Sequence, residues 1–338
     1  MPARHPRRAL LKAGLALAAL LTAPVLSHPA RAAEKLVFML DWQAEAEHGG
    51  YFQAVAEGLY QKAGLDVTIV PGGPGMSAQQ MLAAGKIDGT IGSNAFYVLN
   101  LVEAGAKVKA VASMFQKDPT ILMAHAQNTT SLADLKGRPI FLGDPSINTL
   151  WRWLKSKYPY EDGQIRRYTG SLAPFLTTPA AAAQGYVTSE PLIAKKAGAD
   201  VKVFLLADQG YDGYSGLVMF NDAYIQAHPA AVKAFVAATA EGWRHYLHGD
   251  AAAADALIRK SNPDMDAETL AYGRKALVDN GIVEGTPAGS NATGPDAIGR
   301  MTAARWEGFT TEMKRLGIYK AGTDWKAGVD LGNYTRGL

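Results

Sequence analysis

Residues 35–70 have the sequence KLVFMLDWQAEAEHGGYFQAVAEGLYQKAGLDVTIV, and their pattern of apolar residues indicates the fold. Residues 35–40 form an apolar run typical of a strand, residues 50–63 have apolar side chains at helical spacing, and residues 66–70 form a second strand. Gly64 stands where the helix has to stop. A strand, a helix and a strand in this order predict a mostly parallel sheet with helices on its faces.

The same alternation continues to residue 114 and then begins again. Within residues 77–114 we expect two helices and two strands, and after residue 121 short strands alternate with helices up to a strand over residues 215–220. Four further helices are predicted, over residues 229–247, 251–260, 267–280 and 298–316. No segment of linker composition separates the two series. Two lobes joined by short crossing strands therefore fit better than two domains on a flexible linker.

The composition excludes several classes of protein. The 338 residues include no cysteine, which rules out disulfides, thiolate nucleophiles, zinc–thiolate sites and iron–sulfur clusters. Residues 1–33 hold five of the 34 basic residues and none of the 31 acidic ones, so the rest has 29 basic and 31 acidic side chains. A near-neutral body lacks the basic face of a nucleic-acid-binding protein, and we expect no nucleic-acid partner.

The N-terminus has the organisation of an export signal. A pair of arginines precedes an apolar run over residues 13–26, which is shorter than the ~20 residues that cross a bilayer as a helix. Ala30 and Ala32 occupy the two small positions of a cleavage site. We therefore expect residues 1–32 to be a signal peptide of the twin-arginine or the Sec type, cleaved near Ala32, and the mature protein to be periplasmic.

Several segments, taken in order, resemble those of the solute-binding proteins of ABC importers for sulfonates, nitrate and thiamine precursors. They are LDW at 40–42 with His48 after it, AEGLY at 56–60, AGLDV at 63–67, LAAGKID at 82–88 and SLADLKG at 131–137. Each segment alone is weakly specific, whereas the ordered set spans nearly all of the mature chain. The LDW opening with its following histidine looks most like that of binders of thiamine pyrimidine precursors.

The resemblance implies the α/β fold of a type II periplasmic binding protein, with two lobes and a ligand cleft between them. We place lobe one at residues 33–121 plus 218–338 and lobe two at residues 122–217. The resemblance also implies a monomer that closes on a small-molecule ligand and delivers it to an ABC permease and its ATPase. Contact with a membrane is then expected through the permease alone.

Fungal thiamine-pyrimidine synthases share this fold and provide the enzymatic alternative, because they use their own histidine as a substrate together with PLP and iron. By the resemblance, Tyr97 occupies the position of that histidine, and the synthases' cysteine-rich motif falls near residues 211–216 of a chain without cysteine. Their glycine-rich phosphate loop corresponds to residues 143–146, where Asp144 would repel a phosphate. We therefore expect a binding protein and not an enzyme, with no cofactor and no metal.

The candidate ligand-binding residues of lobe one follow the ends of its strands, where open α/β sheets bind ligands. They are Asp41, Trp42, His48, Ser93, Asn94, Tyr97, Ser113 and Phe115. Trp42 offers an aromatic plane for a heterocycle, Asp41 an acceptor and His48 a donor. Asp41 and His48 could equally serve the local backbone. Ser93 and Asn94 precede a helix, where a polar cradle can form.

The candidates of lobe two lie in three short stretches. They are Asp144, Ser146, Tyr186, Glu190, Tyr211 and Tyr214. Glu190 just before Pro191 would direct a carboxylate from a helix start into the cleft, where it could accept two N–H groups of an aminopyrimidine. Its alternative role is that of a charge partner for the helix N-terminus. Tyr211 and Tyr214 could supply an opposite aromatic face.

The candidate residues are aromatic and acidic and include no arginine. Sulfonate and nitrate need fixed positive charge or many N–H donors, so a flat neutral or weakly basic nitrogen heterocycle fits better. We expect a thiamine pyrimidine precursor of the formylaminopyrimidine or hydroxymethylpyrimidine type. The alternatives are riboflavin, a sulfonate- or nitrate-type anion, and a signalling role with a sensor in place of the permease.

Overall fold

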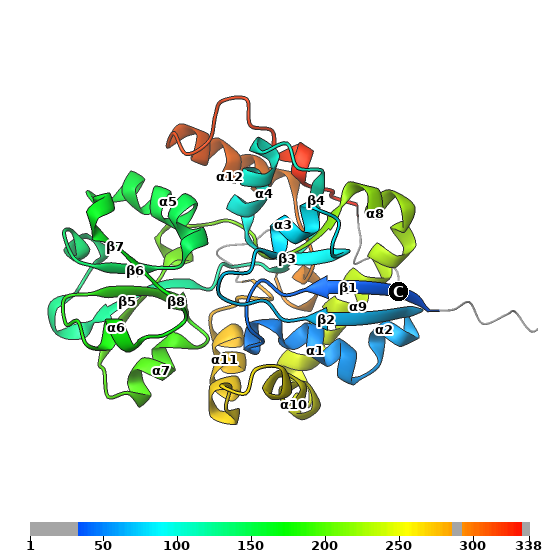
Figure 1. The fold of residues 1–338 in the computed structure, drawn as a ribbon, viewed down its shortest axis with the longest axis horizontal. Helices are drawn as coiled ribbons and strands as arrows, with labels where there is room; N and C mark the ends of the chain where they lie inside the picture. Colours follow the sequence, from blue (N-terminus) through cyan, green and yellow to red (C-terminus); the bar gives the residue numbers. More distant parts are fainter. Residues whose placement is uncertain (1–32, 286–292, 333–338) are drawn as a thin grey trace, which may run out of the picture. The chain divides into compact units, whose positions relative to one another are not determined.

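Two five-stranded sheets form the centres of two α/β lobes (Figure 1). The structure, a computed structural model, describes residues 33–285 and 293–332, so the export signal expected over residues 1–32 lies outside the described residues. The first sheet contains, in order, β2 (Leu65–Val70), β1 (Glu34–Met39), β3 (Gly89–Asn94), β10 (Ser215–Asn221) and β4 (Val108–Phe115). The second contains, in order, β7 (Ile165–Arg167), β6 (Ile140–Leu142), β8 (Ala182–Tyr186), β5 (Thr120–His125) and β9 (Val201–Leu205).

Each sheet is mixed, with four strands that run in one direction and one strand that runs against them, which agrees with the expectation of mostly parallel sheets. β10 pairs antiparallel with β3 and β4, and β5 pairs antiparallel with β8 and β9. These are the strands on which the chain enters each sheet from the opposite lobe. Because each starts at the end of the sheet that faces the other lobe, it runs against the neighbours that finish there.

Helices cover both sheets at the places where the sequence pattern puts them, with some changes at their ends. In lobe one they are α1 (Gly49–Ala56), α2 (Leu59–Lys62), α3 (Ala78–Ala83), α4 (Ala95–Glu103), α8 (Asp222–Ala227), α9 (Pro229–His248), α10 (Ala252–Ser261), α11 (Ala267–Asp279) and α12 (Ala303–Arg315). In lobe two they are α5 (Leu150–Lys157), α6 (Ala173–Leu176) and α7 (Glu190–Lys196). The single helix expected over residues 50–63 is interrupted at Gly58, whose φ of 66° is left-handed. The helix expected from residue 298 starts at Ala303, because the Thr302 side chain caps it by accepting from Arg305 N–H.

The start of α1 is fixed by close packing against α9. A Cβ on Gly242 would lie 2.2 Å from the carbonyl oxygen of Gly50, and one on Gly50 would lie 2.3 Å from Cγ of Trp243. Beneath this contact the ring of Phe38 lies 4.6 Å from that of Phe235. The turn between β1 and α1, which contributes to the site described below, is therefore attached to a rigid helix pair.

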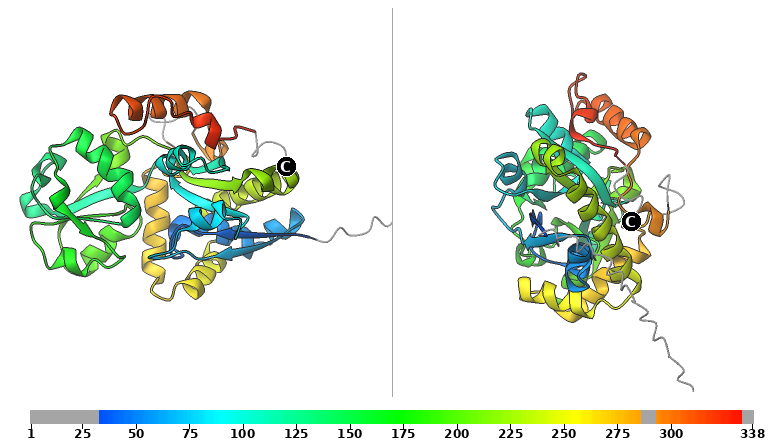
Figure 2. Two further views of the ribbon diagram at one scale, coloured as in Figure 1. Left: turned by 45° about the horizontal axis from the view of Figure 1, so that its top comes forward. Right: turned by 90° about the vertical axis from the view of Figure 1, so that its right-hand side faces the viewer.

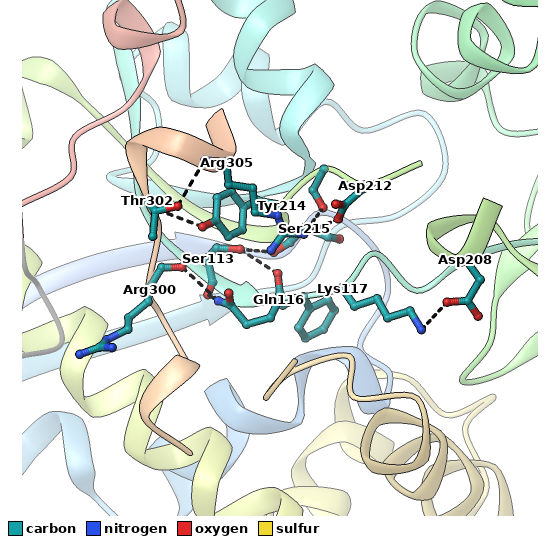
Figure 3. Close-up of polar contacts among 12 residues, drawn as sticks. Ser113, Gln116, Lys117, Asp208, Asp212, Tyr214, Ser215, Arg300, Thr302 and Arg305 are labelled. Atoms are coloured by element: carbon teal, nitrogen blue, oxygen red, sulfur yellow. Dashed lines mark hydrogen bonds and ion pairs between the residues drawn. The ribbon is translucent and has the colours of Figure 1, made fainter. Parts of the chain in front are cut away.

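The second of the two segments that cross between the lobes, residues 210–214, is held by α12 (Figure 3). Arg305 Nη2 donates to Asp212 Oδ1 at 2.9 Å, and its guanidinium carbon lies 4.2 Å from the centre of the Tyr214 ring. The Tyr214 hydroxyl accepts the N–H of Thr302 at 2.9 Å. These contacts are typical of charge-assisted and cation–π interactions, and they tie this crossing segment to lobe one.

The first crossing segment, residues 116–119, has contacts with both lobes (Figure 3). Gln116 Nε2 donates to the carbonyl oxygens of Ser113 and Arg300. Lys117 Nζ lies 2.6 Å from Asp208 Oδ1, which follows β9 in lobe two. The connection between the lobes is therefore short and well supported by side chains.

Asp118, in the same segment, is a buried acid with half of its carboxylate satisfied. It is 1% exposed, Oδ1 accepts the N–H of Thr120 at 2.8 Å, and Oδ2 has no hydrogen-bond partner among the described residues. Burial raises the pKa of Asp118 to about 6 from its ordinary value of 3.8, against the lowering effect of Thr120 and of the Arg305 charge.

We expect the ionisation of Asp118 to destabilise the protein as the pH rises. Because the folded state holds the proton more tightly than the unfolded state, the stabilisation is present below about pH 4 and is lost as the pH rises through about 6, by about 3 kcal/mol in total. Asp118→Asn should lack this dependence. The test is urea unfolding of both proteins between about pH 4 and about pH 7. Parallel pH profiles would contradict the expectation.

Candidate functional site

A cavity of about 150 Å³ lies between the two sheets and is lined by residues of both lobes. Its lobe-one wall follows the ends of β1, β3 and β4, and its lobe-two wall follows β6 and β8. Eleven of the fourteen site residues predicted from the sequence line it: Asp41, Trp42, His48, Ser93, Asn94, Tyr97, Phe115, Ser146, Tyr186, Glu190 and Tyr211. Most of the residues chosen from the sequence because they follow strand ends, where α/β sheets bind ligands, therefore line one cavity.

Ser113, Asp144 and Tyr214 lie outside the cavity lining that the structure describes. The Ser113 hydroxyl is fully buried between strands and is hydrogen-bonded with the carbonyl oxygens of Phe115 and Ser215. Asp144 is exposed and pairs with an arginine of β7 at 2.7 Å, while Tyr214 faces α12 as described above. A position near a strand end does not by itself decide the direction of a side chain.

Asp41, His48 and Ser93 form one hydrogen-bonded group on the lobe-one wall. The N–H of Glu45 donates to His48 Nδ1 at 3.1 Å, so this nitrogen carries no proton and the ring hydrogen is on Nε2. Nε2 then donates to Asp41 Oδ1 at 3.2 Å, and the Ser93 hydroxyl donates to Asp41 Oδ2 at 2.5 Å. The His48 ring thus contacts the local backbone, which is the kind of role also considered for it, and it orients Asp41, whose partners in the described chain are the side chains of His48 and Ser93.

Glu190 is held at the start of α7 by three donors of lobe two. The Tyr168 hydroxyl donates to Oε1 at 3.0 Å, and the N–H of Tyr186 and the hydroxyl of Ser189 donate to Oε2 at 2.7 Å each. Gly185 makes this arrangement possible, because a Cβ there would lie 2.7 Å from Cδ and Cγ of Glu190. The carboxylate is positioned at the cavity wall with part of its accepting capacity free.

Two further carboxylates, Glu45 and Glu47, line the cavity and were not anticipated from the sequence. They belong to the turn after β1, in and before the short 3-10 helix η1 (Ala46–His48). Burial, followed by the charges of Glu47 and Glu190, raises the pKa of Glu45 well above its ordinary value. Burial also raises the pKa of Glu47, opposed by its hydrogen bond with Thr188.

Aromatic rings complete the walls. Tyr51, Tyr97, Tyr168, Tyr186 and Tyr211 line the cavity together with Trp42. The Trp42 indole reaches across to lobe two, since a Cβ on Gly170 would lie 3.4 Å from its Cζ2. Tyr211 is fixed by stacking on Phe96 at 5.2 Å and by accepting a hydrogen bond from Asn94 Nδ2.

The charged side chains of the cavity are acidic. Asp41, Glu45, Glu47 and Glu190 line it, and no lysine or arginine is among its described lining residues. PLP needs a lysine for its Schiff base or a cradle for its phosphate, so the residues present do not fit this cofactor. Within the described residues, no cluster of three or more His, Asp or Glu side chains is arranged to hold a metal ion.

Solved structures with the same architecture define the class of protein. The alkanesulfonate-binding protein SsuA from Xanthomonas axonopodis pv. citri, bound to MOPS, matches with a TM-score of 0.64 at 14% identity over 88% of this chain and 99% of that chain. The periplasmic aliphatic sulphonate binding protein SsuA from Escherichia coli matches with a TM-score of 0.62 at 15% identity, over 87% and 91%. The chain therefore has the periplasmic binding protein fold, which confirms the fold inferred from the sequence.

The sequence matches the family described as NMT1/THI5 like over residues 45–253, more than half of the chain, and the protein belongs to this family. The formylaminopyrimidine-binding protein of Halalkalibacterium halodurans is 29% identical over 240 residues, which are 67% of this chain and 71% of that protein. These matches confirm the family resemblance. No helix in the described part of the chain is long and apolar enough to cross a membrane.

We expect Glu45→Gln to raise the free energy of unfolding at about pH 7 by about 1–3 kcal/mol, because it removes a desolvated charge among like charges and keeps an acceptor. The gain should fade at about pH 4, where Glu45 is protonated in both states. Urea unfolding at the two pH values measures it.

Glu103→Gln is the matched control for Glu45→Gln. A hydrogen bond from the Thr323 hydroxyl lowers the pKa of Glu103, so its neutralisation should not stabilise the protein. Equal effects of the two substitutions would show that the environment of Glu45 is not what makes its charge unfavourable.

Proposed function

We propose that this protein is the periplasmic solute-binding component of an ABC importer and binds a thiamine pyrimidine precursor of the formylaminopyrimidine or hydroxymethylpyrimidine type. The observation that carries the proposal is a cavity with four carboxylates, several aromatic rings and no lysine or arginine among its lining residues in the described chain. Carboxylates accept the N–H groups of an aminopyrimidine, and aromatic rings cover its faces. The name of the 29% identical relative supports the same ligand class.

Charge and size argue against the alternative ligands. A sulfonate, a nitrate or a phosphate ester would bring a negative charge among Asp41, Glu45, Glu47 and Glu190 without a cation to offset it. A cavity of about 150 Å³ accommodates one six-membered ring such as benzene. Riboflavin, with three fused rings and a ribityl chain, is much larger. The proposal therefore favours a single heterocycle.

The proposal includes the arrangement inferred from the sequence. The mature chain begins near Ala33, lobe one comprises residues 33–121 plus 218–338, lobe two comprises residues 122–217, and the eleven cavity residues named above contact the ligand. The membership of the two sheets supports this division, except that its boundaries fall two residues inside β5 and three residues inside β10. The monomer closes on its ligand and is recognised by a permease and its ATPase. The synthase alternative receives no support from the cavity, because its residues do not fit PLP.

A thermal-shift panel tests the ligand class. For the chain from residue 33 onward we expect stabilisation by formylaminopyrimidine and hydroxymethylpyrimidine, of about 2.7 kcal/mol at a hundred times Kd. Hydroxymethylpyrimidine phosphate, PLP, riboflavin, taurine and nitrate should give no comparable shift. A shift with a sulfonate or nitrate and none with the pyrimidines would refute the ligand proposal, and a yellow complex with PLP would favour the synthase.

We expect Gly185→Ala to weaken pyrimidine binding about tenfold or more, as Glu190→Gln should. The new methyl group displaces the Glu190 side chain without removing a polar group, and a hydrogen bond to a charged group contributes about 1.5–3 kcal/mol. Isothermal titration measures Kd.

Gly163→Ala is the control for Gly185→Ala, because a Cβ there would meet no atom of the described chain within 4 Å. Affinities within about twofold of wild type for both Gly185→Ala and Glu190→Gln would show that Glu190 does not contact the ligand.

A further inference from the structure

Glu47 bridges the two lobes at the cavity. It lies in η1 of lobe one, is 5% exposed, and its Oε1 accepts a hydrogen bond from the hydroxyl of Thr188, which follows β8 in lobe two. Its other oxygen, Oε2, is buried and has no hydrogen-bond partner among the described residues. One carboxylate thus holds the opposite lobe with one oxygen and leaves the second unsatisfied in a side chain that lines the cavity.

The unsatisfied oxygen requires a donor. A buried carboxylate oxygen without a hydrogen bond is costly, and burial together with Glu190 already disfavours the charged form of Glu47. The cavity lining described in the structure has no lysine or arginine that could turn toward it. Tyr51, at helical spacing from Glu47 and 1% exposed, also has a hydroxyl without a partner in the described chain. Two unsatisfied polar groups on one wall indicate that a ligand supplies their partners.

The lobes meet closely at this point. In Figures 1 and 2, α11 runs along the boundary between the lobes. A Cβ on Gly273 of α11 would lie 2.6 Å from Cβ of Ala46 and 2.9 Å from the carbonyl oxygen of Thr188. The hydrogen bond of Glu47 with Thr188 therefore forms where the lobes are in contact, and separating the lobes breaks it.

We propose that Glu47 couples recognition of a ligand N–H group to closure of the lobes: Oε2 accepts the N–H while Oε1 holds Thr188. The inference rests on the proposed function and adds one requirement to it. The ligand must present an N–H donor to Glu47, either from an exocyclic amino group or from a protonated ring nitrogen. A donor at Oε2 favours the charged carboxylate, which is the stronger acceptor for the Thr188 hydroxyl. Thr188 is not among the cavity-lining residues, so its influence on affinity operates through the closed state.

The test compares wild type, Glu47→Gln, Thr188→Val, Thr188→Ser and the Glu47→Gln/Thr188→Val double variant. The probes are hydroxymethylpyrimidine and an analogue in which hydrogen replaces its amino group. Titration calorimetry gives Kd, and small-angle X-ray scattering gives the ligand-induced change in radius of gyration. Circular dichroism checks folding, and Thr188→Ala replaces Thr188→Val if the latter does not fold.

We expect Glu47→Gln to raise Kd for hydroxymethylpyrimidine about tenfold or more, because only one of the two terminal positions of an amide is an acceptor and the other is an NH2 donor. Thr188→Val should raise Kd and reduce the ligand-induced compaction, and Thr188→Ser should show wild-type values of both. The Kd of the double variant should rise by less than the product of the two single fold-changes, because both substitutions act on the same hydrogen bond. The analogue should bind weakly, with a Kd that Glu47→Gln leaves unchanged.

Two different failures can be told apart. If hydroxymethylpyrimidine binds and compacts wild type, but Glu47→Gln or Thr188→Val stays within twofold of wild type with full compaction, the coupling by Glu47 is refuted and the proposed function stands. If wild type binds neither hydroxymethylpyrimidine nor formylaminopyrimidine, the proposed function fails and the coupling fails with it.

Discussion

The burial of four carboxylates in one cavity is the constraint on which the rest of the site depends. Desolvation and neighbouring like charges raise the pKa values of Glu45 and Glu47 and so disfavour the charged forms of these two. The structure offsets this with dedicated donors: Ser93 for Asp41, and the N–H of Tyr186 for Glu190. The absence of a side chain at position 185 leaves room for Glu190 beside its donors. A cavity of this kind presents hydrogen-bond acceptors on both of its walls.

Much of this arrangement could be predicted from the sequence, because it follows from periodicity and from the rule that ligands bind at strand ends. Trp42 and Glu190 were located in this way. Glu45 and Glu47 were missed because their direction depends on how the turn after β1 folds over the strand end, for which a single sequence gives no signal. The antiparallel direction of β5 and β10 depends on which strands cross between lobes. Threonine is a common N-cap residue, so Thr302 could have indicated that α12 starts at Ala303 and not at residue 298.

The sulfonate-binding proteins share the fold of this chain, but the ligands in their names differ in charge from the ligand proposed here. At 14% and 15% identity those chains share the two-lobed architecture with this one. Their names refer to anions, whereas the cavity of this chain is lined by acids. A shared fold at this level of identity therefore does not decide which ligand is bound, and the acidic side chains that line the cavity of this chain lie in turns and at a helix start after its strands.

The missing side chain at Gly273 defines a mechanical stop. Where α11 of lobe one meets lobe two, position 273 lies against the carbonyl oxygen of Thr188, and there is no room for even one methyl group between them. Such a contact cannot be compressed further, so the end point of the motion is set by the scaffold and not by the size of the molecule inside. A smaller ligand would leave a void, but it would not draw the lobes nearer. The outer surface of the two lobes in contact then has one shape, whatever fills the cavity between them.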